Sequence, residues 1–125
     1  MIKTYLSDLQ KSKPLSSQEE LQLATSARSG NIQARNKLVQ ANLRYAFHLA
    51  NKFRTSALPL EDLVSAANLG LMTAAEKFDP SFGVRFITYA RTWIQEAIMR
   101  ELKERYLIHT PSAKEQMHTT LIDLS

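Results

Sequence analysis

Residues 60–79 read LEDLVSAANLGLMTAAEKFD, and this stretch decides the fold. Its apolar residues recur at intervals of three and four, the period of a helix with one buried face. They are Leu60, Leu63, Val64, Ala67, Leu71, Ala74 and Ala75. Pro59 suits the first turn of such a helix, and Glu61 and Asp62 lie near the positive end of its dipole. Gly70 interrupts the pattern at a cost of about 1 kcal/mol. We therefore predict a helix that packs closely against another helix at Gly70.

A second helix follows after the turn FDPSFG, residues 78–83. Residues 83–100 read GVRFITYARTWIQEAIMR, and their apolar period predicts a helix over 86–105. Its apolar positions are Phe86, Ala90, Trp93, Ile94, Ala97, Ile98 and Leu102. The same helix is rich in aromatic and basic residues, a combination that binds single-stranded nucleic acid by stacking bases and neutralising phosphates.

The aromatic rings of this helix have two interpretations. Spacing alone favours a core role for all three, Phe86, Tyr89 and Trp93. In the alternative, Phe86 and Trp93 are buried along one edge and Tyr89 lies on the margin, where a base could reach it. Basic residues would then line the outer surface: Arg85, Arg91, Arg100 and Lys103.

The remaining sequence also predicts helices. Ser16 and Ser17 are each followed three residues later by a glutamate, and Gly30 stands at a C-cap position, so a capped helix is expected over 17–29. Residues 31–54 have the pattern of one long amphipathic helix. A short helix is expected over 3–10, and residues 112–121 either begin another helix or fray. The fold class is all-α, a compact domain of about four main helices.

Composition narrows the function. The net charge is +4, with nine Lys/Arg against three Asp/Glu in residues 1–58 and seven against nine in 59–125. A basic surface is therefore local to the first half, and it favours a polyanionic partner without requiring one. The chain has no cysteine, no apolar run of membrane-spanning length and no signal-peptide pattern at its start, so we expect a cytoplasmic protein.

Enzyme chemistry is not indicated. The sequence has no glycine-rich phosphate loop and no nucleophile elbow. His48, His109 and His118 lack the spacing of metal ligands, and Glu61 and Asp62 point to different helix faces. We expect a protein that is not an enzyme and that needs no cofactor or metal.

Three segments in order resemble region 2 of bacterial RNA polymerase sigma factors of the housekeeping type. They are ANLRYAFHLANKF (41–53), LEDLVSAANLGLMTAAEKFD (60–79) and GVRFITYARTWIQEAIMR (83–100). Residues 5–40 look like region 1.2 of that family. The resemblance implies three parts: region 1.2-like helices in 1–40, region 2-like helices in 41–105, and a tail or the start of a truncated region in 106–125.

The resemblance also implies two partners. The first helix quoted above would dock on the coiled coil of the polymerase β′ clamp through Glu61, Asp62, Ser65, Asn68 and Met72. The aromatic helix and its surroundings would recognise the −10 promoter element and capture its melted non-template strand. Phe78, Asp79 and Tyr89 match positions around the flipped −11 adenine, and Trp93 matches the upstream edge of the bubble. The full DNA-binding set is Asn42, Arg44, Phe78, Asp79, Arg85, Phe86, Tyr89, Thr92, Trp93, Glu96, Met99 and Arg100, with Phe86 also expected to be structural.

This chain departs from the family at its reading positions. Thr92 replaces the first tryptophan of the family's pair, and Glu96 and Met99 replace the glutamine and threonine that read the −12 base pair. Glu96 would prefer a cytosine amino group, whereas Met99 offers no useful hydrogen bond. The −10 specificity is therefore expected to differ.

Further departures lie in the turn and in the clamp-binding helix. Val84 stands where the family has an aromatic residue, and Phe82 where it has an arginine. Ser65-Ala66-Ala67 replaces Gln-Glu-Gly. A sigma-like initiation factor is the first interpretation. The alternative is a sigma-derived regulator, or one half of a split factor whose second chain supplies −35 recognition, that occupies the clamp without melting DNA. A helical protein–protein module is a remote third.

Overall fold

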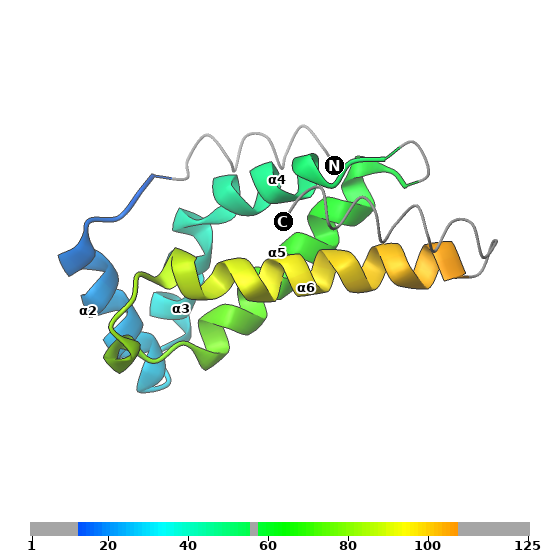
Figure 1. Cartoon of the computed structure of the whole chain (residues 1–125). Helices are drawn as coiled ribbons and strands as arrows, with labels where there is room; N and C mark the ends of the chain where they lie inside the picture. Colours follow the sequence, from blue (N-terminus) through cyan, green and yellow to red (C-terminus); the bar gives the residue numbers. More distant parts are fainter. Residues whose placement is uncertain (1–12, 56–57, 108–125) are drawn as a thin grey trace.

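A computed structural model describes residues 13–55 and 58–107, and all regular structure in these residues is helical. The elements are α2 (Ser17–Arg28), α3 (Ile32–Ala41), α4 (Leu43–Lys52), α5 (Leu60–Lys77), the short 3-10 helix η1 (Pro80–Phe82) and α6 (Phe86–Leu107). Figure 1 shows α5 and α6 at the centre, α4 on one side and α2 with α3 at one end. The all-α prediction is confirmed.

Helices α5 and α6 form the centre of the core. A Cβ atom added at Gly70 would lie 2.7 Å from the carbonyl oxygen of Trp93 and 2.8 Å from the Cα of Ile94. Since both atoms belong to the backbone of α6, only glycine lets the two helices approach this closely. The prediction of close helix packing at Gly70 is confirmed.

The buried stripe of α6 advances four residues at a time. Phe86, Ala90, Ile94 and Ile98 are each 0% exposed, and Leu102 is 2% exposed. They pack against the buried face of α5, which includes Leu63, Ala67, Leu71 and Ala74, and against α4 through Ala46, Leu49 and Ala50. Burial of these apolar groups is the main stabilising term of the domain.

Helix α2 begins and ends as its sequence predicts. The Ser16 hydroxyl accepts from the backbone N–H of Glu19, and the Glu19 carboxylate accepts from the backbone N–H of Ser16, so one register of the capping box is formed. After the helix, Gly30 has φ +103°, which a side chain would strain. Helix α2 packs against α3.

The expectation of one long helix over 31–54 is wrong, because the chain bends at Asn42 between α3 and α4. In a continuous helix, the backbone N–H of Asn42 would donate to the Leu38 carbonyl. Here the Asn42 side-chain amide donates to that carbonyl at 2.8 Å, and the backbone N–H donates to Val39 instead. The side chain of Asn42 therefore replaces one helical hydrogen bond and ends α3. The described residues contain five α-helices, one more than expected.

The predicted turn at 78–83 is present as η1 followed by Gly83 with φ +76°. The helix expected over 86–105 is observed as Phe86–Leu107. The helices expected over 3–10 and 112–121 lie outside the described residues. Among the helices of residues 13–55 and 58–107, none combines the length and the apolar character that crossing a membrane requires.

Candidate nucleic-acid interface

Three partly exposed rings form a continuous strip on one side of the domain. The ring centroid of Tyr89 lies 5.3 Å from that of Phe82 and 6.3 Å from that of Trp93. We call Phe82, Tyr89 and Trp93 the aromatic strip. Phe82 is 50% exposed, and Tyr89 and Trp93 are partly buried. The strip is therefore neither core nor fully solvated. The second interpretation holds for buried Phe86 and marginal Tyr89, whereas Trp93, expected to be buried, is only partly so.

Two further phenylalanines lie behind the strip. Phe78 is 4% exposed, and its ring contacts those of Phe82, Tyr89 and Phe86 at 6.1, 5.5 and 5.3 Å. Phe86 is fully buried. The expectation that Phe78 and Phe86 contact DNA is wrong for this conformation, because their side chains present almost no surface. The ring of Phe78 packs against Phe82 and Tyr89 of the strip, and the ring of Phe86 packs against Phe78.

A lysine lies over one end of the strip. The Nζ of Lys77 is 5.5 Å from the centroid of the Trp93 ring, within the range of a cation–π interaction. Lys77 is exposed at the last turn of α5. The site therefore combines flat apolar faces with a cation beside them, which suits a ligand made of bases and phosphates.

The turn that carries Phe82 is fixed by Asp79. The Asp79 carboxylate accepts from the backbone N–H of Ser81 at 2.9 Å, and this bond lowers the pKa of Asp79. Asp79 also lies 3.5 Å from the guanidinium of Arg28 at the end of α2. The backbone N–H of Phe82 donates to the Asp79 carbonyl at 3.0 Å. Asp79, expected to contact DNA, has a structural role as the N-cap of η1.

Arg85 has partners within the chain. Its guanidinium donates to the Glu20 carboxylate at 3.0 Å, to the Leu15 carbonyl at 2.9 Å and to the Ser17 hydroxyl at 3.3 Å. The same carboxylate oxygen accepts from the backbone N–H of Phe86 at 3.0 Å. In this conformation Nε and both terminal nitrogens are bonded to α2 and the segment before it, so Arg85 has a structural role, and its expected contact with a phosphate stays a prediction.

Glu20 is the residue that the sequence reasoning missed. It is 7% exposed, whereas Glu19 beside it is exposed and serves the capping box. The available signal was its position one turn before Ala24, on the buried face of α2. A carboxylate on an apolar face needs a partner. Sequence could not identify that partner as Arg85, 65 residues away.

The other expected DNA-binding residues of α6 share one face with the strip. Thr92, Glu96, Met99 and Arg100 follow Tyr89 and Trp93 at intervals of three and four, and all four are exposed. The guanidinium of Arg100 lies 3.4 Å from Glu96, an exposed pair of small energetic value. Asn42 and Arg44 lie at the start of α4, where the side-chain amide of Asn42 donates a hydrogen bond to the Leu38 carbonyl.

The expected polymerase-binding residues share the solvent face of α5. Glu61, Ser65 and Met72 are exposed, and Asp62 and Asn68 are partly buried. Leu69, which was not predicted, is 63% exposed on the same face. Asp62 lies 3.2 Å from Arg105, which is also 3.2 Å from Glu101. Between α5 and α6 the face has a groove of about 330 Å³ that includes Asp62, Ser65, Leu69 and Arg100.

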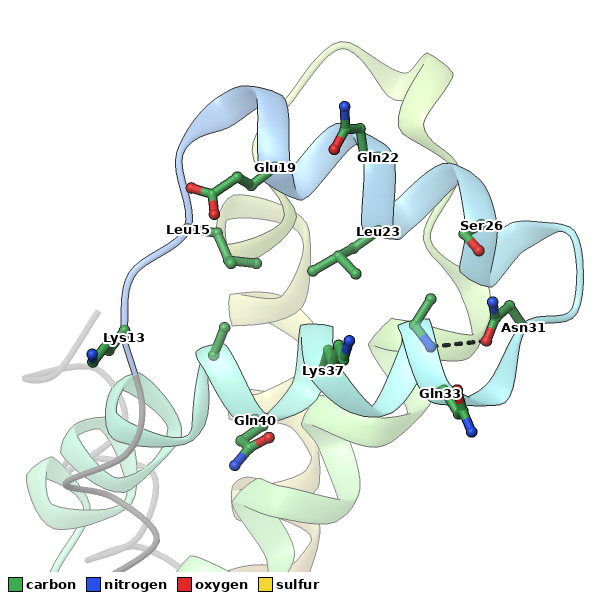
Figure 2. A pocket seen from close by; sticks show the side chains of 12 residues that line it. Lys13, Leu15, Glu19, Gln22, Leu23, Ser26, Asn31, Gln33, Lys37 and Gln40 are labelled. Carbon is green, nitrogen blue, oxygen red and sulfur yellow. Dashed lines mark hydrogen bonds between the residues drawn. The ribbon is translucent and has the colours of Figure 1, made fainter.

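A second groove lies between α2 and α3. Its volume is about 540 Å³, and Figure 2 shows Leu15 and Leu23 pointing into the space between the two helices, with Lys13 on the segment before α2 and Lys37 on α3. Asn31 closes one end, where its side-chain oxygen accepts from the backbone N–H of Ala34 at 3.0 Å and caps α3. None of the residues expected to bind polymerase or DNA lines this groove.

Comparison with known proteins gives the family. The model of sigma-70 region 2 matches residues 38–106. The chain is 42% identical over 98 residues to the RNA polymerase sigma factor RpoS of Coxiella burnetii, covering 78% of this chain and 28% of the relative. It is 40% identical over 97 residues to the sigma-C factor of Myxococcus xanthus, covering 78% and 33%.

A third relative is the RNA polymerase sigma factor SigA of Clostridium acetobutylicum, 38% identical over 104 residues, with 83% of this chain and 28% of the relative covered. The matched part is thus a third or less of the length of each relative. The family match extends over α4, α5 and α6, which carry most of the surfaces described above. The chain therefore belongs to the sigma-70 region 2 family.

Proposed function

We propose that this chain is a sigma-type promoter-recognition module. It docks on core RNA polymerase through the solvent face of α5 and binds the unpaired non-template strand of a −10 element with the aromatic strip. The observation that carries the proposal is the strip itself, three contiguous rings with Lys77 over Trp93, in a chain of the sigma-70 region 2 family.

Strand capture follows from the chemistry of the strip. Stacking of a base on an aromatic side chain contributes about 1–3 kcal/mol, and a base leaves the duplex only if its new contacts offset the loss of stacking. Tyr89 and Trp93 offer such contacts without ordering a disordered loop, since both stand on α6. The neighbouring Glu96 and Met99 give the module a −12 preference that differs from that of housekeeping factors.

Docking uses the other end of α5. Asp62, Ser65, Asn68 and Met72 lie on one face, and the exposed Leu69 and Met72 add apolar surface next to the carboxylate. A polar face with an apolar centre is typical of a protein interface. We propose the coiled coil of the β′ clamp as its partner. Contacts to a −35 element would come from another segment or from a second chain.

The proposal is tested by run-off transcription with bacterial core polymerase and a library of sequences from −12 to −7. We expect initiation on a subset of AT-rich promoters. Asp62→Ala should weaken core binding in a pull-down, whereas Glu76→Ala, an equal charge change near the other end of α5, should not. Failure of the wild-type chain to bind core polymerase or a clamp fragment would refute the proposal.

A sigma-derived regulator is the second candidate, and one observation favours it. Thr92 stands where the family has the first of two tryptophans, so Trp93 is the one tryptophan of the strip. A chain of this kind would occupy the clamp without opening DNA. In the same run-off assay it would bind core polymerase and inhibit transcription by a housekeeping factor.

A further inference from the structure

The side chain of Phe82 has no role in the core of this domain. It is 50% exposed, although a phenylalanine of a small domain is ordinarily a core residue. Its ring is held from one side by Phe78 at 6.1 Å and by Tyr89 at 5.3 Å. The rest of the ring faces solvent. A half-exposed ring in contact with a functional surface needs a functional account.

We propose that Phe82 stacks on an unpaired DNA base and extends the base-binding surface of α6 into the turn before it. This inference rests on the proposed function and adds to it a residue that the family's own pattern does not supply. Where sigma factors have an arginine, this chain has Phe82, and where they have an aromatic residue, it has Val84. The turn thus keeps one ring but presents it two residues earlier.

The turn is rigid enough for this task. η1 is closed by the hydrogen bond from Phe82 to the Asp79 carbonyl, capped by the Asp79 side chain, and followed by Gly83 in the left-handed region. Asp79 is in turn joined to Arg28 of α2. A ring on a preorganised turn loses little conformational freedom when a ligand binds, so more of the stacking energy appears as affinity.

The chemistry of the surroundings selects a base over an apolar protein side chain. The strip continues from Phe82 through Tyr89 to Trp93, whose ring is covered by the ammonium of Lys77. A row of rings with a cation at one end suits the bases and the phosphates of a single strand. Val84, 45% exposed in the same turn, has no ring and serves as a matched control.

The test uses the complex of the full chain with core polymerase and a labelled single-stranded −10 oligonucleotide, with binding followed by fluorescence anisotropy. Phe82→Ala should weaken binding about 5- to 150-fold, the range for loss of one stacked base. Phe82→Trp should bind like the wild type, and Val84→Ala should leave affinity unchanged. Because phenylalanine carries no charge, Phe82→Ala should not alter the salt dependence, whereas Phe82→Arg should steepen it.

A spectroscopic readout separates stacking from a structural effect. With 2-aminopurine in the oligonucleotide, the base over Phe82 should be quenched in the wild type and bright in Phe82→Ala. Phe82 is separated from Asp62 by most of α5, roughly 22 Å along its axis, so binding to core polymerase should be the same in both proteins.

The outcomes are distinct. If Phe82→Ala binds the oligonucleotide like wild type while Tyr89→Ala does not, the inference is wrong and the proposed function stands. If Phe82→Ala loses core binding instead, the ring contacts a protein and the inference is also wrong. If the wild-type complex binds no single strand at all, both the inference and the promoter-recognition proposal fail.

Discussion

Gly70 offers a sharp test of how the two central helices are packed. The change Gly70→Ala adds one methyl group, which would lie 2.7 Å from the Trp93 carbonyl oxygen and 2.8 Å from the Ile94 Cα. Ordinary van der Waals contact begins near 3.4 Å, so α6 must retreat by several tenths of an ångström. Because these atoms belong to the backbone, no side-chain rotation relieves the contact.

Two terms of opposite sign decide the magnitude. Alanine is better than glycine in a helix by about 1 kcal/mol. Overpacking a core costs about 1–3 kcal/mol, and the upper part of that range applies when backbone must move. We expect Gly70→Ala to lower the free energy of unfolding by about 1–2 kcal/mol. For a chain of this size that corresponds to a decrease in Tm of about 4–8 °C.

The assay is urea or thermal unfolding followed by circular dichroism at 222 nm. Ser65 supplies the control, since it is exposed on the same helix. The difference between Ser65→Ala and Ser65→Gly measures the helix-propensity term without packing. Trp93, the chain's only tryptophan, should also change its emission when α6 is displaced. A Gly70→Ala protein that gains as much stability as Ser65→Ala does over Ser65→Gly would refute the close approach of α5 and α6.

Three other substitutions have defined outcomes. Glu20→Gln should lower the free energy of unfolding in urea by about 1–3 kcal/mol, because a carboxylate with two donors is replaced by an amide, whereas the exposed Glu19→Gln should change it little, since glutamine also serves a capping box. The folded-state pKa of Asp79 is lowered, so the stability that its carboxylate contributes is full above about pH 4 and is lost as pH falls through the lowered pKa. The Tm of Asp79→Asn should therefore decline less on acidification than that of the wild type, and an unchanged acid profile would contradict this. Asn42→Ala should lower the unfolding free energy by about 1 kcal/mol, since the bond to the Leu38 carbonyl is lost, and equal stability in urea would show that the bend does not depend on this bond.

Local rules were sufficient for the elements that are closed by local contacts. Ser16 with Glu19, Gly30 after α2 and Gly83 after η1 each act within a few residues, and the observed boundaries follow them. The bend at Asn42 was not predicted, because asparagine also occurs inside amphipathic helices. The hydrogen bond from the Asn42 side chain to the Leu38 carbonyl forms where α3 and α4 both pack on α5. These contacts join residues far apart in the sequence, so a local pattern does not predict them.

The candidate site was predicted as a region but not residue by residue. Helical spacing correctly grouped Tyr89 with Trp93 and gave α5 a polar face. It also placed Phe86 in the core, where it is fully buried, but it could not tell that Phe82 is half exposed, because Phe82 lies in a turn that has no helical period. Nor could helical spacing predict that Arg85 forms an ion pair with Glu20, since ion pairs between distant residues leave no periodic signal in the sequence.

The contact of Glu20 with the first turn of α6 has a consequence for how such chains can be divided. The match to the family begins at residue 38, yet the acceptor of the Phe86 backbone N–H belongs to α2. A fragment cut at that boundary would leave a buried donor without its acceptor, at the first turn of α6. The segment that the family model matches is thus smaller than the unit of folding. Grafts that take α6 from this chain should therefore take α2 with it, because the Glu20 carboxylate of α2 binds the first turn of α6.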